Sequence, residues 1–402
     1  MRSLSIGWLA LTMLCAISPM GADAQRWEPP DGRFPVLGWV IPSADGFQDY
    51  ADAGFTVLWA TRVEDLHAAE AAGLNSLVRR DGEDDTEPEV QQFVRETMDR
   101  PGVIGHALKD EPGIDDLDRW IEYREWAEQV WPGGLYQINL FPNYASPEQM
   151  DVPTYREYVS AYMERFRPKV LSFDHYPLIG EDDIRPQYYE NLEIIREAAL
   201  EADVPFWAFA LVTPHWSYRD PAEAEIRFQV FSNLVYGAQG IWYFCYKQPG
   251  PEFFLGGIVD RQERRTHHYP QVARINAILR AWGPTLLDLR STGVSHVGEL
   301  PQGTHGLLEN GLARSVTPAD PMIVGEFEHV DGGRYLMLMN RDWHGVRTWR
   351  VTLAEDVTAL REVSRRTGEL EEPLRIGPDG VRLRVMAGGA RLFRVEDSRS
   401  RQ

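Results

Sequence analysis

Lys109, Asp110 and Glu111 end an apolar stretch at 102–112 and stand directly before Pro112. Two adjacent carboxylates repel each other's ionised forms, so one of them is expected to keep its proton to higher pH, as a general acid must. Pro112 removes a ladder donor and restricts Glu111 to an extended or turn conformation, which would fix the carboxylate at the end of the stretch. Strand alternation places Lys109 on the face of Glu111, where an ammonium would lower the pKa again. The sequence leaves this competition open.

A second apolar stretch, at 169–177, ends on Asp174, His175, Tyr176 and a proline. Further polar and aromatic residues stand near the ends of other apolar stretches: Trp39, Asn139, His215, Trp242, Tyr243 and Tyr246. Carboxylates that move protons, beside rings that stack on sugar faces, are typical of a carbohydrate cleft. The alternative is that strand ends carry charge because they meet water, that His175 is a packing residue, and that the rings are core.

Metal chemistry has little support. His267 and His268 are adjacent, but no His-x-His motif ends the first apolar stretch and no zinc-like cysteine spacing exists. No G-x-G-x-x-G follows an early strand, which weakens a dinucleotide-binding interpretation. We therefore expect no catalytic metal and no cofactor.

The apolar stretches themselves predict the fold. Eight of them are near-continuously apolar, as strands covered on both faces should be. They span 35–42, 54–60, 73–80, 102–112, 134–142, 169–177, 205–213 and 237–246. Amphipathic stretches between them, such as 63–73, 115–131, 188–203 and 221–237, predict helices; Asp220 would cap the last of these and Pro221 would begin it. Eight strand–helix pairs predict an α/β fold of the (β/α)8 TIM-barrel type, with a doubly wound open sheet as the rival.

The pattern changes near residue 287. From there apolar and polar residues alternate between turn signals such as Asp331-Gly332 and Asp379-Gly380, which predicts a small antiparallel β-sandwich. The predicted organisation is a signal peptide at 1–24, the barrel at 25–286, the sandwich at 287–397 and a tail at 398–402.

The N-terminal segment and the composition indicate where the protein is located and which partners it can bind. Arg2, an apolar run at 4–17 and Ala22-Asp23-Ala24 are typical of a cleaved secretory signal, so we expect a secreted or periplasmic protein with no membrane span in the mature chain. The 402 residues carry a net charge of −20, which argues against a nucleic-acid partner. Neutral substrates such as carbohydrates are compatible with this charge. The oligomeric state is open.

Several motifs resemble the (β/α)8 glycoside hydrolases of the large retaining clan, clan A. In that clan a fourth strand ending Asn-Glu-Pro carries the acid/base, and here "KDEP" at 109–112 stands in its place, so Glu111 matches the Glu while Asp110 departs from the Asn. The passage "AEIRFQVFSNLVYGAQGIWYFCY" resembles the link between the seventh and eighth strands. "GIVDRQERRTHHYPQVARINAILRAWGP" is similar to the final helix before an appended β-sandwich. The resemblance covers most of 35–397 as architecture but only short motifs as sequence.

The resemblance implies a hydrolase of O-glycosidic bonds with Glu111 as general acid/base, but one part of the pattern is missing. The clan takes its nucleophile from a Glu ending the seventh strand, and "PFWAFALVTPHW" has no acid there. Three alternatives follow. Asp174 is the second carboxylate; or Asp110 and Glu111 act as a consecutive pair, as in substrate-assisted hexosaminidase-like enzymes; or the chain binds carbohydrate without cutting it.

Overall fold

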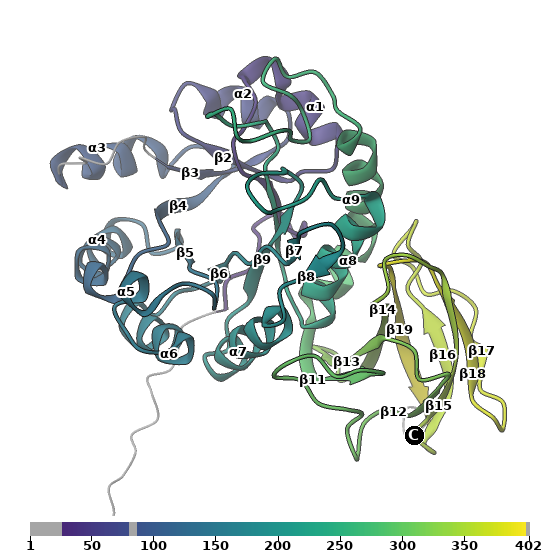
Figure 1. The fold of residues 1–402 in the computed structure, drawn as a ribbon. Helices are drawn as coiled ribbons and strands as arrows, with labels where there is room; N and C mark the ends of the chain where they lie inside the picture. Colours follow the sequence, from purple (N-terminus) through teal and green to yellow (C-terminus); the bar gives the residue numbers. More distant parts are fainter. Residues whose placement is uncertain (1–25, 80–86, 399–402) are drawn as a thin grey trace, which may run out of the picture.

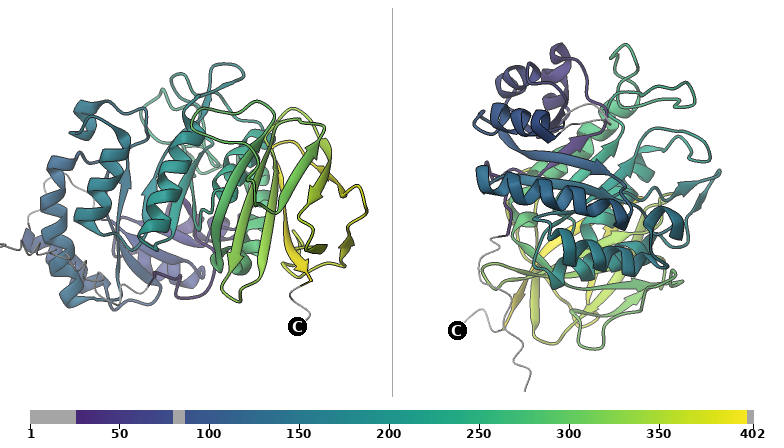
Figure 2. Two further views of the ribbon diagram at one scale, coloured as in Figure 1. Left: turned by 90° about the horizontal axis from the view of Figure 1, so that it is seen from below. Right: turned by 90° about the vertical axis from the view of Figure 1, so that its left-hand side faces the viewer.

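The computed structural model describes residues 26–79 and 87–398. The predicted signal peptide lies outside this part of the chain, as does the predicted tail except Ser398. The described residues form a ring of helices around a closed barrel, with an antiparallel β region packed against one side of the ring (Figure 1). Two further views show the barrel and the β region lying side by side (Figure 2).

The eight predicted strands all form, and they close into one parallel barrel in the order β1-β10-β9-β6-β5-β4-β3-β2. Their bounds are β1 (Val36–Gly38), β2 (Val57–Ala60), β3 (Asn75–Val78), β4 (Val103–Asp110), β5 (Leu135–Leu140), β6 (Leu171–Phe173), β9 (Phe206–Leu211) and β10 (Ile241–Phe244). Closure excludes the open doubly wound sheet and confirms the (β/α)8 barrel.

Helices fill the connections between strands. They are η1 (Ala44–Gly46), α1 (Phe47–Asp52), α2 (Asp65–Ala71), α3 (Glu87–Thr97), η2 (Ile114–Asp116), α4 (Leu117–Val130), α5 (Pro147–Met150), α6 (Tyr155–Phe166), α7 (Tyr188–Glu201), α8 (Glu223–Val235) and α9 (His268–Leu287). A short hairpin of β7 (Leu178–Ile179) and β8 (Asp183–Ile184) follows β6. Among the described residues no helix is long and apolar enough to cross a membrane.

The start of α8 differs from the prediction. Pro221 and Ala222 precede the helix, and the Glu225 carboxylate accepts a hydrogen bond from the Ala222 N–H at 2.8 Å. That glutamate therefore satisfies one of the free N–H groups at the helix start. Asp220 is not the cap, because its carboxylate lies 2.8 Å from Nε2 of His268 on α9.

Alternate residues of the strands face the barrel interior and the helices. Leu37, Trp207, Phe209 and Trp242 fill the interior, and the intervening residues pack against the helical ring. Both faces of most strands are thus mainly apolar, which explains why the sequence shows near-continuous apolar runs.

The C-terminal region consists of antiparallel sheets, as predicted. One contains β11 (Leu289–Val297), β13 (Met322–His329), β14 (Arg334–Asn340), β19 (Ala390–Asp397), β16 (Val357–Glu362) and β17 (Leu374–Arg375), in that order; the other contains β12 (Ala313–Thr317), β15 (Arg347–Leu353) and β18 (Val381–Val385). Trp349, Leu338 and Phe393 belong to the core between them. Ile323 and Met337 belong instead to the core shared with the helices, so the region is anchored to the barrel. The predicted domain boundary at 286/287 falls in the last turn of α9.

Candidate active site

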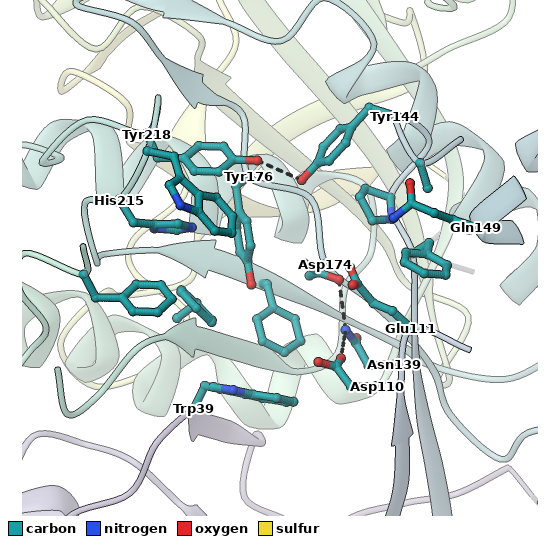
Figure 3. A pocket seen from close by; sticks show the side chains of 17 residues that line it. Trp39, Asp110, Glu111, Asn139, Tyr144, Gln149, Asp174, Tyr176, His215 and Tyr218 are labelled. Atoms are coloured by element: carbon teal, nitrogen blue, oxygen red, sulfur yellow. Dashed lines mark hydrogen bonds between the residues drawn. The ribbon is translucent and has the colours of Figure 1, made fainter. Parts of the chain in front are cut away.

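A cavity of about 390 Å³ opens at the carboxyl ends of the barrel strands, where barrel enzymes hold their active sites (Figure 3). Its size is within the range of small-molecule sites. The residues that line it are mostly aromatic or acidic: Trp39, Asp110, Glu111, Asn139, Phe141, Pro142, Tyr144, Ala145, Gln149, Asp174, Tyr176, Phe209, His215, Trp216, Tyr218, Phe244 and Phe254.

The floor of the cavity is a hydrogen-bonded network across three neighbouring strands. The register pairs Asp110 of β4 with Asn139 of β5, and Asn139 with Ser172 of β6. The Ser172 hydroxyl donates to Asn139 Oδ1 at 3.0 Å, which orients the amide. Asn139 Nδ2 then donates to Asp110 Oδ1 at 3.1 Å and to Asp174 Oδ1 at 2.9 Å. One amide therefore bridges two carboxylates and fixes both.

Glu111 leaves the strand in a strained conformation. Its backbone φ is +47°, in the left-handed region that side-chain-bearing residues rarely adopt, and not the extended form expected before a proline. The turn is held on both sides: the Glu111 N–H donates to the Asn139 carbonyl at 2.8 Å, and the buried Tyr158 hydroxyl donates to the Pro112 carbonyl at 2.7 Å. Strain of about 1–3 kcal/mol that the surroundings enforce is typical of functional positions.

The electrostatics separate the roles of the carboxyl groups. Burial, followed by the negative charges of Asp174 and Asp110, raises the pKa of Glu111 far above its ordinary range. Burial and Asp110 also raise the pKa of Asp174, but to a smaller extent. The side-chain hydrogen bond between the two groups raises the pKa of Glu111 further and opposes the rise for Asp174. Of this pair, Glu111 is therefore the group whose surroundings favour the protonated form more strongly.

The competition that the sequence left open is decided by geometry. Burial raises the pKa of Asp110, and the hydrogen bond from Asn139 and the charges of Arg79 and Lys109 oppose this rise without cancelling it. Neither cation is among the groups that set the pKa of Glu111. The turn after Asp110 thus separates Glu111 from the ammonium group, and the carboxyl repulsion expected from the sequence prevails.

The contact between Glu111 and Asp174 does not match the usual spacing of glycosidase carboxylates. Retaining enzymes hold the two groups about 5–5.5 Å apart and inverting enzymes about 6.5–9.5 Å apart. Hydrogen-bonded oxygens are closer, about 2.5–3.0 Å. A ligand atom that accepts the Glu111 proton must therefore take the place of Asp174.

Aromatic side chains and a neutral histidine form the walls. The ring of Tyr176 lies 5.3 Å from that of Phe244. The carbonyl of Thr213 can only accept, so the contact of 2.8 Å from His215 Nδ1 places the imidazole proton on that nitrogen. Burial lowers the pKa of His215, which leaves Nε2 as an uncharged acceptor. The cavity can thus offer flat apolar faces together with directional polar groups.

Seven of the residues expected from the sequence line this cavity: Trp39, Asp110, Glu111, Asn139, Asp174, Tyr176 and His215. Their functional roles stay predictions.

Four others do not line it, which corrects their expected position. Tyr243 points outward to the helices, and its hydroxyl donates to Asn276 of α9 at 2.9 Å. Tyr246 packs against Tyr50 and Phe55 outside the barrel.

Trp242 and His175 are also buried away from the cavity. Trp242 points inward but lies stacked on Phe209 in the barrel interior. His175 lies beside Tyr144, and its Nδ1 is 3.1 Å from Asn191 Oδ1. Burial lowers the pKa of His175 to about 3, so its imidazole is uncharged.

Sequence reasoning missed the residues contributed by loops. Tyr144 and Gln149 follow β5, Trp216 and Tyr218 follow β9, and Phe254 follows β10. The Tyr144 and Tyr218 hydroxyls are 3.2 Å apart. The available signal was the presence of aromatic residues in the Pro- and Gly-containing loops "TPHWSY" and "GPEFFLGG".

One group in the described ranges has the composition of a metal site, and it lies outside the cavity. It comprises Asp220, His267 and His268, and the Asp220 carboxylate lies 2.8 Å from His268 and 3.6 Å from His267. These contacts fasten the loop after β9 to the start of α9. The expectation of no catalytic metal stays a prediction.

Comparison with known proteins supports the architecture. No protein-family model and no curated protein matches the chain. A β-galactosidase from Bacillus circulans sp. alkalophilus superposes with a TM-score of 0.54 at 8% identity, covering 92% of this chain and 99% of that one. A catalytic mutant of a GH42 β-galactosidase from G. stearothermophilus superposes with a TM-score of 0.52 at 9% identity, covering 90% and 98%.

A β-galactosidase from the psychrophilic Marinomonas ef1 gives a weaker superposition, with a TM-score of 0.43 and 9% identity. That alignment covers 61% of this chain and 60% of the neighbour's own length. At these identities the neighbours show the fold alone: this chain has the barrel and appended antiparallel sheets of solved glycoside hydrolases.

Proposed function

We propose that this protein is a glycoside hydrolase that cleaves O-glycosidic bonds of a neutral oligo- or polysaccharide, with Glu111 as the general acid. The observation that carries the proposal is the carboxyl pair in the cavity, in which burial and two neighbouring carboxylates keep a proton on Glu111. A general acid must be protonated at working pH and positioned to donate, and Glu111 meets both requirements. The fold shared with solved glycoside hydrolases is consistent with this chemistry.

The first step follows from the hydrogen bond. A glycosidic oxygen that enters the cavity replaces Asp174 as acceptor and takes the Glu111 proton as the bond to the anomeric carbon breaks. The electron pair of that bond stays with the departing oxygen. The anomeric carbon then forms a new bond, either to the Asp174 carboxylate, from which water later displaces it, or to a water molecule that Asp174 deprotonates. Water supplies the new hydroxyl group in both cases, and Glu111, left as a carboxylate, regains its proton from that water or from solvent. Asn139 donates to Asp174 at 2.9 Å and so holds its charge in place.

The cavity favours an uncharged sugar. Its lining includes Asp110, Glu111 and Asp174 but, among the described residues, no lysine and no arginine. A uronate or a sulfated sugar would therefore meet negative charge with no counter-ion in the wall. Trp39, Phe244 and Tyr176 instead offer apolar faces for ring carbons. Export of the protein is part of the proposal and is supported by the signal-like segment at 1–24.

A substrate-assisted mechanism is the second candidate, because the touching pair of Glu111 and Asp174 matches neither usual spacing. Asp110 also lines the cavity directly beside Glu111 along the chain, where it could orient an acetamido group of the substrate. The two mechanisms differ in substrate: only this one requires a 2-acetamido sugar. Activity on glucosides, galactosides or mannosides without that group would exclude it.

The test is the hydrolysis of neutral oligosaccharides and aryl glycosides by the wild type and by Glu111→Gln. Loss of the general acid is expected to lower kcat about 10²–10⁴-fold. Aryl glycosides with good leaving groups, which need less protonation, should lose less. Glu252→Gln is the matched control, since Glu252 is exposed in the loop after β10 and does not line the cavity.

Full activity of Glu111→Gln on a natural glycan would overturn the assignment. A wild type that binds glycans tightly and cleaves none would support instead the non-catalytic carbohydrate-binding protein. The absence of an acid at the end of β9 is the observation that favours this last alternative. The proton held on Glu111 argues against it, because binding alone does not require a strained, protonated carboxyl group.

A further inference from the structure

Two loops at the rim of the cavity carry an unusual surface. Among the described residues seven large hydrophobic side chains are exposed, and the only aromatic ones are Trp216 and Phe253. Trp216 is 75% exposed and Phe253 is 40% exposed, while Leu255 beside them is 72% exposed. Exposed apolar surface costs about 25 cal/mol per Å², so a cluster of this kind at a cavity mouth calls for a binding partner.

The two aromatic rings form a flat, supported ledge. Their centroids are 5.2 Å apart and their planes are tilted by 23°. Phe253 rests in turn on Phe254, with centroids 4.5 Å apart, and Phe254 packs 5.0 Å from His215 in the cavity wall. One face of the Trp216 indole is thus backed by Phe253, and the exposure of the ring leaves the other face to solvent.

The backbone holds Trp216 in this position at a cost. His215 and Tyr218 exchange both backbone hydrogen bonds, at 3.2 and 2.8 Å, which makes Trp216 part of a tight turn. The φ of Trp216 is +47°, a left-handed conformation that is strained for a bulky residue. No burial of the side chain offsets this strain. Glu111 is the other cavity residue that is strained in this way, and it carries the proposed chemistry.

The ledge is continuous with the cavity, because Trp216 and Phe254 also belong to the cavity lining. The Leu255 N–H donates to the Pro214 carbonyl at 2.9 Å and joins the two loops. A ligand that leaves the cavity on this side must cross the open face of the indole. This flat ring surface extends a cavity whose floor is polar, which suits a chain of sugar units. The apolar C–H faces of sugars stack on aromatic rings while their hydroxyl groups stay in water.

We propose that Trp216, backed by Phe253, is a stacking platform for sugar units of a neutral glycan chain that lie outside the cavity. The proposal rests on the proposed function and extends it: the enzyme is selective for chains over single glycosides. The −20 net charge of the protein and the uncharged ledge favour a neutral polysaccharide over an anionic polymer or a lipid surface.

The experiment compares kcat/KM on a ladder of neutral oligosaccharides with kcat/KM on the corresponding aryl monoglycoside. Trp216→Ala should lower the ratio of long to short substrate roughly 3- to 10-fold, the scale of one aromatic stacking contact. Trp216→Phe, which keeps a flat ring, should restore part of the ratio. Val330→Ala is the matched control, since Val330 is 79% exposed between β13 and β14, does not line the cavity, and should leave the ratio unchanged. An unaltered ratio in Trp216→Ala would overturn the platform.

Binding separates this proposal from the proposed function. If the wild type cleaves no glycan, the proposed function fails, and the platform is then tested by affinity electrophoresis in a gel that contains a neutral polysaccharide. Retardation of the wild type and of Val330→Ala, but not of Trp216→Ala, would support the platform. Equal mobility of Trp216→Ala and the wild type would refute it.

Discussion

The floor of the cavity and its rim are built in opposite ways. The floor consists of polar groups at the ends of β4, β5 and β6, and each has its partner: Ser172 orients Asn139, and Asn139 bridges Asp110 and Asp174. The rim consists of loops after β5, β9 and β10, which contribute aromatic rings such as Trp216. The floor concentrates like charges in a buried place, whereas the rim exposes apolar surface to water. The buried like charges of the floor destabilise the fold but suit the proposed proton transfer. The exposed apolar surface of the rim also destabilises the fold but suits the proposed binding of a glycan chain.

Removal of the second carboxylate is the most severe change to the floor. We expect Asp174→Asn to lower kcat about 10²–10⁴-fold, because the developing positive charge loses its counter-ion. The same change removes a negative charge that raises the pKa of Glu111, so the alkaline limb of the pH–rate profile should move to lower pH. The measurement is the pH dependence of kcat on an aryl glycoside.

Asp183→Asn serves as the control, because Asp183 lies exposed on β8 outside the cavity. Full activity of Asp174→Asn with an unmoved alkaline limb would remove Asp174 from the site and leave Asp110 as the second carboxylate.

The buried carboxyl group of Glu111 should also lower the free energy of unfolding at neutral pH. The pKa of Glu111 is raised from about 4.5 to about 10 in the folded state. The unfolded chain releases this proton above pH 4.5 while the folded protein keeps it, so this contribution to stability is greatest below pH 4.5 and declines as pH rises toward 10. Glu111→Gln does not titrate, and it should be more stable than the wild type by on the order of 3 kcal/mol at pH 7, since each pH unit above 4.5 costs the wild type about 1.4 kcal/mol.

Urea unfolding at pH 5 and pH 8 checks this, since the difference between Glu111→Gln and the wild type should grow with pH. Glu252→Gln, an exposed site, should show no such growth. A variant less stable than the wild type at pH 8 would mean that Glu111 is ionised and paired in the folded protein.

Loss of the Asn139 amide should destabilise the folded protein, while Glu111, the proposed general acid, is kept. Asn139→Ala deletes the amide that donates to Asp110 and Asp174, and each carboxylate loses a hydrogen bond. Hydrogen bonds to charged groups contribute about 1.5–3 kcal/mol, and the unfolding free energy should fall by about that amount. Thermal or urea denaturation measures it, with Gln137→Ala as the buried amide control on the same strand. If both variants lose the same unfolding free energy, the loss comes from removing a buried amide and not from the hydrogen bonds of Asn139 to the two carboxylates.

The barrel and the floor follow from local sequence, whereas the rim does not. Continuous apolar runs in βα alternation determine the strands, and residues such as Asp110, Glu111, Asn139 and Asp174 lie where those runs end, so their convergence follows from the parallel barrel alone. The inward or outward direction of a side chain at the end of a run depends on register, which is why Tyr243 was misplaced. The conformations of the loops that bring Trp216 and Phe254 together depend on contacts distant in sequence, such as that between Leu255 and Pro214.

The smallest expected effect tests the boundary between floor and rim. The Tyr218 hydroxyl lies 3.2 Å from that of Tyr144 and accepts a hydrogen bond from the half-buried Arg185 at 3.1 Å, so it joins two rim loops. Tyr218→Phe keeps the ring and removes this link, and a single net hydrogen bond contributes about 0.5–1.5 kcal/mol. We expect KM for oligosaccharides to rise a few-fold, with little change in the pH–rate profile. A shift of that profile would show that the rim also sets the protonation of Glu111, and the division between the two regions would then fail.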